Sequence, residues 1–198
     1  MNFLPVAGNH INAEHVSINT QQIYEQTLVL RSQLGDEAAF AELLALDGLH
    51  LLSFTRHMMR SSPEQVEDLV QEIWLAIYRG LPRLREVARF RSWAFRIARD
   101  RIYREYRRRK IPIRPLEEGE MEELPETGET SMALDGEELQ RGLDAHSPVH
   151  RDVLVLCFFE DMSYEEIARV TETTLGTVRS RIYYARRALK TARERKMI

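Results

Sequence analysis

The chain has 198 residues, of which 43% are hydrophobic and 30% are charged, and its net charge is −3. This balance predicts a soluble globular protein of one or two domains and excludes a chain that is disordered throughout. The start MNFLPVAGNH lacks the features of a signal peptide, and no run approaches the roughly 18 apolar residues of a membrane helix. A single cysteine, Cys157, excludes an internal disulfide framework. We therefore expect a cytoplasmic protein without membrane insertion.

Charge is distributed in blocks along the chain. Residues 79–114 carry a net charge of +11, from 14 basic and three acidic residues, and residues 176–198 carry +7, from eight basic residues and one acidic residue. Between them, residues 115–145 carry −10, from 11 acidic residues and one basic residue. A charged run is usually only a solvated face, but two basic blocks that contain aromatic residues favour a polyanionic partner.

Apolar periodicity predicts helices through the first half of the chain. Residues 1–21 are polar and aperiodic, which predicts a mobile N-terminal tail. From residue 23 to residue 59 apolar residues recur at helical intervals, with breaks expected at residues 35–36 (Gly-Asp) and 47–48 (Asp-Gly). Pro63 opens a third helix, whose apolar stripe continues to a stop at Gly80 and Pro82.

A basic helix rich in aromatic residues is predicted over residues 90–110, before two prolines. Its Trp93, Phe95, Tyr103 and Tyr106 are interleaved with arginines. Unpaired bases stack on aromatic rings while arginines hold the backbone, so this composition suits single-stranded nucleic acid. The alternative is a helix whose aromatic residues form core and whose arginines are solvated, and the sequence leaves both open.

The second half of the chain predicts a linker and a second helical domain. Residues 113–137 are rich in Glu and Gly and carry few large apolar groups, which predicts a flexible acidic linker. In the last domain, residues 138–198, a helix is expected from Ser147, and Ser163 with Glu166 forms a capping box that opens another. The predicted fold is all-α, with two small helical domains.

The stretch from residue 163 to residue 190 predicts two helices joined by a short turn. In the second helix Val178, Ile182, Ala185 and Leu189 share one face, which we expect to pack inward. The opposite face is basic and rich in hydroxyl groups. On a recognition helix, arginines bind guanine edges or phosphates, and short hydroxyl side chains permit close approach to DNA. The pattern therefore favours a helix-turn-helix that reads duplex DNA. A plain hairpin in a helical bundle remains the alternative. The candidate DNA-contacting residues are Thr177, Arg179, Ser180, Tyr183, Tyr184, Arg186 and Arg187.

One module for duplex DNA and another for opened DNA fit a factor that locates a promoter and melts it. The chain resembles bacterial RNA polymerase sigma factors of the extracytoplasmic-function (ECF) type, group IV of the sigma-70 family, which keep only regions 2 and 4. GDEAAFAELL, EDLVQEIWLAIYRGLPRL and FRSWAFRIARDRI, within residues 35–102, resemble region 2. HRDVLVLCFFEDMSYEEIARV and GTVRSRIYYARRAL, within residues 150–189, resemble region 4. The resemblance places region 2, a helical bundle, at residues 22–112 and region 4, a helix-turn-helix, at residues 138–198.

The resemblance implies a role for each surface. Asp68, Gln71 and Glu72 match the segment that docks on the clamp helices of the polymerase largest subunit. The helix from residue 90 matches the segment that captures the −10 element and holds its opened strand. The second helix of the helix-turn-helix matches the reader of the −35 element. The residues expected at the −10 element are Arg91, Trp93, Phe95, Arg96, Arg99, Asp100, Arg101 and Tyr103.

The resemblance also implies partners. These are core RNA polymerase, including its flap region for region 4, promoter DNA as duplex and as single strand, and an anti-sigma factor that can hold the protein at the inner membrane face. Neither a cofactor nor a metal is expected. His146, His150 and Cys157 have helical spacing but lack a fourth ligand nearby, so Cys157 is interpreted as a core residue.

The chain departs from the family pattern at four positions. Glu172 stands where Gly is common, in a turn that favours positive φ, and Thr174 stands where Pro is common. We expect local strain or a shifted turn there. Asp100 replaces a common Asn and Tyr184 a frequent Arg, so promoter preference cannot be copied from relatives.

Two other functions fit part of the sequence. A stand-alone helix-turn-helix regulator explains the C-terminal motif but not the basic aromatic helix. An enzyme acting on nucleic acid lacks a visible catalytic constellation, because the paired carboxylates are near neither a nucleophile nor a phosphate loop.

Overall fold

The computed structural model describes the backbone of residues 13–59, 61–113 and 147–194, and side chains from residue 20 to residue 187 within these ranges. Every regular element described is a helix, which confirms the predicted all-α class. Residues 1–12 and 114–146 lie outside the described residues, and with them most of the predicted tail and linker. The first helix begins at Ala13, so the expected tail to residue 21 was too long.

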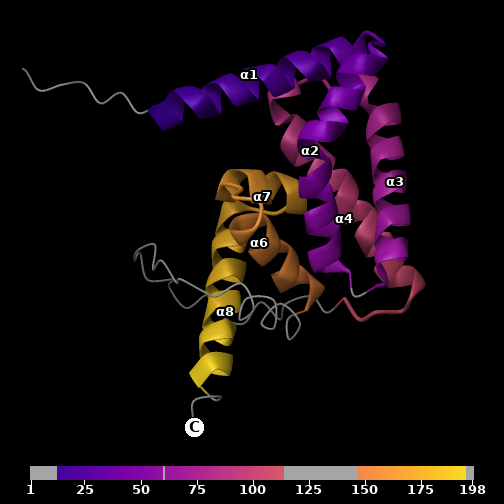
Figure 1. The fold of residues 1–198 in the computed structure, drawn as a ribbon. Helices are drawn as coiled ribbons and strands as arrows, with labels where there is room; N and C mark the ends of the chain where they lie inside the picture. Colours follow the sequence, from indigo (N-terminus) through magenta and orange to yellow (C-terminus); the bar gives the residue numbers. More distant parts are fainter. Residues whose placement is uncertain (1–12, 60, 114–146, 195–198) are drawn as a thin grey trace, which may run out of the picture.

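Long helices form the described part of the N-terminal unit (Figure 1). They are α1 (Ala13–Gln33), α2 (Glu37–Met58), α3 (Pro63–Gly80) and α4 (Phe90–Arg108), with short 3₁₀ turns at Leu81–Arg83 and Val87–Arg89 between α3 and α4. In Figure 1, α2, α3 and α4 lie side by side while α1 crosses their upper end.

The break predicted at residues 35–36 is confirmed, but the one at residues 47–48 is wrong. Gly35 has φ +89°, and the Asp36 carboxylate caps α2 by accepting a hydrogen bond from the Ala39 amide at 3.0 Å. In contrast, α2 continues through Asp47 and Gly48 to Met58. The buried side chains keep helical spacing on both sides of the glycine, so packing outweighs the roughly 1 kcal/mol that glycine costs in a helix.

Within residues 147–194, the described part of the C-terminal unit, lie three helices, α6 (Pro148–Phe158), α7 (Tyr164–Thr171) and α8 (Leu175–Glu194). The predicted capping box is confirmed, since the Ser163 hydroxyl accepts from the Glu166 amide while the Glu166 carboxylate accepts from the Ser163 amide. Helices α7 and α8 are joined by residues 172–174, and they form the expected helix-turn-helix.

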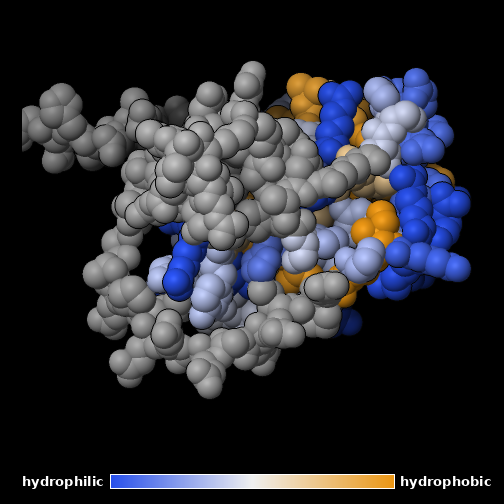
Figure 2. All heavy atoms as spheres, turned by 90° about the horizontal axis from the view of Figure 1, so that it is seen from below, coloured by the Kyte–Doolittle hydropathy of each residue, from blue (hydrophilic) through white to orange (hydrophobic). Residues whose placement is uncertain are grey.

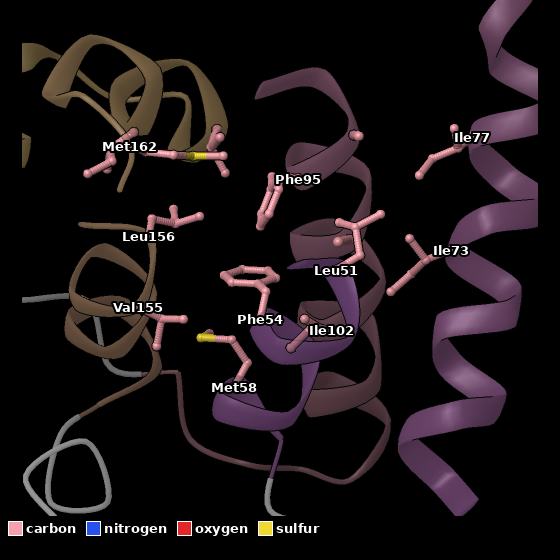
Figure 3. Close-up of a cluster of buried hydrophobic side chains, with 14 of the residues drawn as sticks. Leu51, Phe54, Met58, Ile73, Ile77, Phe95, Ile102, Val155, Leu156 and Met162 are labelled. Atoms are coloured by element: carbon pink, nitrogen blue, oxygen red, sulfur yellow. The ribbon is translucent and has the colours of Figure 1, made fainter. Parts of the chain in front are cut away.

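Both units contribute to one continuous hydrophobic core. α6 packs against α2, and α7 packs against α4. Figure 3 shows the junction, where Phe54 and Phe95 lie between Ile73 and Ile77 of α3 on one side and Leu156 and Met162 of the C-terminal unit on the other. The two units, expected as domains on a linker, therefore dock directly on each other in this structure.

Helix α2 is long and apolar enough, by length and composition, to cross a membrane, which the sequence reading did not anticipate. Its Leu43, Leu51 and Phe54 are fully buried among the other helices, and the core helix of a soluble protein passes the same test. Seen from below, the described surface around α3 and α4 is mainly hydrophilic with separate hydrophobic patches (Figure 2).

Two helical glycines should respond oppositely to alanine. A Cβ on Gly80 would lie 2.9 Å from the ring of Trp93, whereas a Cβ on Gly48 would meet only Leu44 at 3.9 Å. We expect Gly80→Ala to lower the free energy of unfolding by about 1–3 kcal/mol, because the indole has to move. Gly48→Ala should raise it by about 0.5–1 kcal/mol through helix propensity. Urea unfolding measures both, and equal effects of the two changes would contradict the packing described for Trp93.

Candidate nucleic-acid interface

Helix α4 presents two faces with different neighbours. Phe90, Ala94, Ala98 and Ile102, four residues apart, are buried in the N-terminal unit. A second row at the same spacing, Arg91–Phe95–Arg99–Tyr103, lies against the C-terminal unit. The guanidinium of Arg91 lies 5.9 Å from the ring centre of Phe95, and that of Arg99 lies 4.3 Å from the ring centre of Tyr103. The interleaving seen in the sequence thus becomes a row of stacked arginine–aromatic pairs.

The buried Asp152 carboxylate of α6 binds Arg99 and Tyr103, the last two residues of this row. The Asp152 Oδ2 atom accepts hydrogen bonds from Arg99 Nε at 2.8 Å and from the Tyr103 hydroxyl at 2.7 Å. We call these three residues the Asp152 cluster. The Asp152 side chain is 0% exposed and that of Arg99 is 15% exposed. Burial raises the pKa of Asp152, and the charge of Arg99 opposes this rise.

Two further α4 arginines also bind the C-terminal unit. Arg91 donates to the backbone carbonyl of Glu160 at 2.5 Å, and Arg96 pairs with the Glu172 carboxylate at 3.0 Å. The Glu160 carboxylate, which is fully buried, lies 2.9 Å from His50 of α2. The C-terminal unit therefore offers α4 an array of anionic and carbonyl oxygens.

The remaining residues predicted to hold opened DNA are divided between core and surface. Phe95 is buried against Phe54, with ring centres 5.3 Å apart, and Trp93 packs beside Phe90. Arg101 lies 3.6 Å from the Glu72 carboxylate of α3, and Asp100 is exposed. Of the eight predicted residues, five lie at the interface with the C-terminal unit: Arg91, Phe95, Arg96, Arg99 and Tyr103.

The predicted outer face of α8 is largely accessible. Arg179, Tyr183 and Arg187, four residues apart, are exposed, and Thr177, Ser180 and Tyr184 are half-buried beside them. Arg186 lies elsewhere, with its guanidinium 5.0 Å from the ring centre of Phe158 in α6. The inward residues Val178, Ile182 and Ala185 are buried, as predicted, and the side chain of Leu189 lies outside the described residues.

The turn before α8 keeps its geometry despite its unusual residues. Glu172 adopts φ +54° and ψ +43°, the left-handed conformation that favours glycine, and its amide donates to the Ala168 carbonyl. Thr174 then begins α8, since its hydroxyl accepts from the Thr177 amide at 3.1 Å. The strain expected at Glu172 is present as a positive φ.

The polar face of α3 continues into an apolar hollow. Asp68, Gln71 and Glu72 are exposed, as expected for a docking face. One turn further on, Leu75 is 47% and Tyr78 is 48% exposed. They line a hollow of about 380 Å³, together with Glu37, Phe40 and Trp74. The sequence reading assigned Leu75 and Tyr78 no role, although an apolar residue on a polar face was a readable signal.

The candidate metal ligands considered in the sequence were His146, His150 and Cys157. Among the described residues no group of three His, Cys, Asp or Glu side chains is arranged to hold a metal ion. Cys157 is half-buried and packs against the core, where burial raises the pKa of its thiol. His146 lies outside the described residues.

A pair of carboxylates lies where α1, α2 and α4 meet. The pair consists of Glu25 and Asp47, and we call it the Asp47 cluster. Asp47, 7% exposed, has an Oδ2 atom without a hydrogen-bond partner among the described residues. Burial raises the pKa of Asp47 to about 6, against the opposing charges of Arg91 and His50. Burial and the nearby Asp47 carboxylate raise the pKa of Glu25 to about 7, with Arg91 again opposing the rise.

Comparison with known proteins is consistent with this geometry. Residues 48–111 match the family model described as Sigma-70 region 2, and residues 137–189 match that of Sigma-70, region 4. The chain is 30% identical over 182 residues to the ECF RNA polymerase sigma-E factor of Escherichia coli K12, covering 86% of this chain and 94% of the relative. It is 34% identical over 170 residues to the ECF RNA polymerase sigma factor SigE of Mycolicibacterium smegmatis, covering 79% and 63%.

Two solved structures share the fold. CnrH, in complex with the cytosolic domain of CnrY, matches with a TM-score of 0.66 and 23% identity over 86% of this chain and 97% of that chain. The sigma factor RpoE of Bartonella quintana, in complex with the anti-sigma factor NepR, matches with a TM-score of 0.60 and 24% identity over 77% and 94%.

The Asp47 cluster predicts a stability difference that depends on pH. Because folding raises the pKa of Asp47 from 3.8 to about 6, its ionisation destabilises the fold as pH rises through this window. We expect Asp47→Asn to leave the free energy of unfolding unchanged near pH 4 and to raise it by about 1–3 kcal/mol at pH 8. Urea unfolding from pH 4 to pH 8 measures the difference. A difference that does not vary with pH would contradict the raised pKa.

Proposed function

The chain belongs to the ECF type of the sigma-70 family, with regions 2 and 4, and from this premise we propose that α3 docks it on core RNA polymerase, α4 holds the opened −10 element and α8 reads the −35 element. As a sigma factor it serves transcription initiation and is not an enzyme. Family membership disfavours the nucleic-acid enzyme and the stand-alone regulator. The observation that supports the proposal best is the arrangement of three chemically distinct surfaces on three different helices.

The exposed face of α3 supports polymerase docking. Its Asp68, Gln71 and Glu72 offer acceptors to a basic partner, and the hollow beside Leu75 and Tyr78 accepts an apolar side chain. Interfaces commonly combine a polar rim with an apolar centre that excludes water. We propose that the clamp helices of the polymerase largest subunit cover both parts.

Charge and aromatic surface support the role of α4. Its arginines can bind backbone phosphates, and the half-buried ring of Trp93 can stack with an unpaired base, whereas the ring of Tyr103 is buried in this structure. Arg104, Arg107 and Lys110 at its end are exposed and extend the positive surface beyond the residues that the resemblance assigned to the −10 element. We assign them to non-specific phosphate contact, because they lie beyond the aromatic row.

The exposed stripe of α8 supports a reading role in the major groove. Arg179 and Tyr183 lie one turn apart at the start of the helix, where a recognition helix meets base edges. Arg187 lies one turn further on. Arg186 packs on Phe158, so we propose that it positions α8 on α6 and does not contact DNA.

A partner protein also belongs to the proposal. Both solved structures above are complexes of a relative with another protein, and in one of them the partner is named an anti-sigma factor. We propose that an anti-sigma factor regulates this chain, that region 4 meets the polymerase flap, and that the protein acts in the cytoplasm, held at the inner membrane face when the anti-sigma factor is membrane-bound.

Reconstituted transcription tests the proposal as a whole. The full-length protein is mixed with bacterial core polymerase on a randomised promoter library, and the transcripts are sequenced. Transcripts that share a −35 and a −10 element support the three assignments and give the promoter sequence. If no transcripts form while the protein binds duplex DNA tightly by itself, the proposed division of labour is wrong.

Asp68→Arg should abolish polymerase binding. The change puts a positive charge in the acidic docking face, and like-charge contact at an interface costs about 3 kcal/mol or more, which lowers affinity at least roughly 100-fold. Surface plasmon resonance against immobilised core polymerase measures the loss. Glu165→Arg, an equal charge reversal at an exposed site of α7, is the matched control. Wild-type affinity of a folded Asp68→Arg protein would remove the docking assignment.

Arg179→Ala should change specificity at a single base pair of the −35 element. If Arg179 binds a guanine edge in bidentate fashion, its loss costs about 1–3 kcal/mol at that position. Transcription from a promoter set with every single −35 substitution measures this cost. Arg169→Ala, at an exposed arginine of α7, controls for the loss of charge. A uniform loss on all promoters would instead assign Arg179 to a phosphate.

A further inference from the structure

Helix α1, which crosses the upper end of the N-terminal unit (Figure 1), carries a row of apolar side chains on its outer side. Leu28 is fully buried and holds the inner side of α1 on the core. On the outer side Ile23 is 56%, Leu30 is 51% and Leu34 is 88% exposed. A single exposed leucine is ordinary, but a contiguous row of large apolar side chains marks a binding surface. We call this row the α1 stripe: Ile23, Thr27, Leu30 and Leu34.

The spacing of the α1 stripe suits another helix as its occupant. Its residues follow one another at intervals of four, three and four, which is the spacing of a helix seam that packs against a second helix. The Thr27 hydroxyl donates to the Ile23 carbonyl at 2.8 Å, so covering Thr27 leaves no donor unsatisfied. The short side chain of Thr27, in the middle of the stripe, also lets a facing helix approach closely.

The two edges of the α1 stripe differ in charge. Because successive residues of a helix turn by about 100°, Tyr24 and Arg31 lie along one edge and Leu30 lies along the other. On the first edge Arg31 pairs with the Asp36 carboxylate at 2.7 Å, and the Tyr24 hydroxyl donates to the exposed Glu42 carboxylate of α2. An occupant of the stripe therefore has to match an apolar edge and a charged edge at the same time.

A second copy of α1 matches both edges when the two helices run antiparallel. A two-fold axis that passes between the helices at Thr27 brings Leu30 of one copy to Ile23 of the other, so the apolar edges meet. The same axis brings Arg31 of one copy to Tyr24 and Glu42 of the other, which sets a positive charge beside a negative one. In a parallel pair the axis runs along the helices, and the edge with Leu30 would meet the edge with Arg31, which disfavours that arrangement.

We propose that two copies of this chain associate through the α1 stripe as an antiparallel pair with two-fold symmetry. A surface that pairs with itself forms a closed dimer, in which both stripes are covered. One pair of helices makes a small interface, below about 1,200 Å², so we expect a weak dimer with a dissociation constant on the order of 10 μM. The inference does not rest on the proposed function, because α1 carries none of the residues assigned to polymerase or DNA.

Sedimentation velocity of the full-length protein tests the association. The mass of one chain is 23.2 kDa. Between roughly 1 and 200 μM, a range that spans the expected dissociation constant, the weight-average mass of the wild type should rise from that value towards twice that value.

Charged substitutions in the α1 stripe should weaken the dimer. Leu30→Asp places one carboxylate from each copy in the apolar contact, and we expect the dissociation constant to rise at least about tenfold. Ile111→Asp is the matched control, an equal change at an exposed residue just beyond α4, and it should associate like the wild type. Circular dichroism checks the fold of each variant. If Leu30→Asp is unfolded, Leu34→Asp decides, because the Leu34 side chain is 88% exposed.

Disulfide trapping tests the direction of the two helices. Cys157, the single cysteine of the chain, is first replaced by serine. In the antiparallel pair Thr27→Cys lies at the two-fold axis and should form a covalent dimer in a glutathione redox buffer. Leu34→Cys should stay monomeric on denaturing gels, because its two copies lie about 20 Å apart along the helices, too far for a disulfide. In a parallel pair both variants would form covalent dimers.

Three results would overturn the inference. A wild-type protein that stays monomeric up to roughly 200 μM would refute the pairing and leave the α1 stripe to a helix of a different protein. A dimer that neither Leu30→Asp nor Leu34→Asp weakens would place the contact elsewhere on the chain. Covalent dimers of Leu34→Cys that form as readily as those of Thr27→Cys would refute the antiparallel arrangement.

Discussion

A buried carboxylate, Asp152, constrains how the two units dock on each other. Asp152 is entirely removed from water, which is costly for a charge unless donors replace the lost hydration. Arg99 and Tyr103 supply those donors, and both come from the other unit. The α6 helix therefore cannot bury Asp152 favourably without docking on α4. The same contact buries Tyr103 and most of Arg99 in this structure.

Local pattern was sufficient to predict most of the helices. The stripe of α3 and the capping box of α7 are short-range features, because each depends on side chains within one or two turns. The predicted break at residues 47–48 failed for a tertiary reason. An Asp-Gly pair signals a turn in isolation, but α2 is held straight by core contacts on both sides of it, with Asp47 itself buried.

The sequence was sufficient to predict which residue types form the candidate site on α4. It was not sufficient to predict which partners their side chains contact. A row such as Arg91–Phe95–Arg99–Tyr103 has the same spacing whether its rings meet bases or a protein core, so the sequence left the choice open. The deciding partner, Asp152, is 49 residues from Tyr103 and 53 from Arg99 along the chain. A lone carboxylate in the apolar stretch DVLVL was a visible anomaly, yet nothing local identified its partners.

Glu172 connects the turn of the helix-turn-helix to the surface of α4. A glycine there would adopt the left-handed conformation without the roughly 1 kcal/mol that an L side chain pays. It would also lack the carboxylate that binds Arg96 at 3.0 Å. Because the Arg96–Glu172 pair is exposed, the ion pair stabilises the fold by an amount comparable to the backbone strain at Glu172. The ion pair therefore does not clearly outweigh the strain. The position of its charge therefore explains this residue better than stability does, because Glu172 places an anion from the turn of the helix-turn-helix against Arg96 of α4.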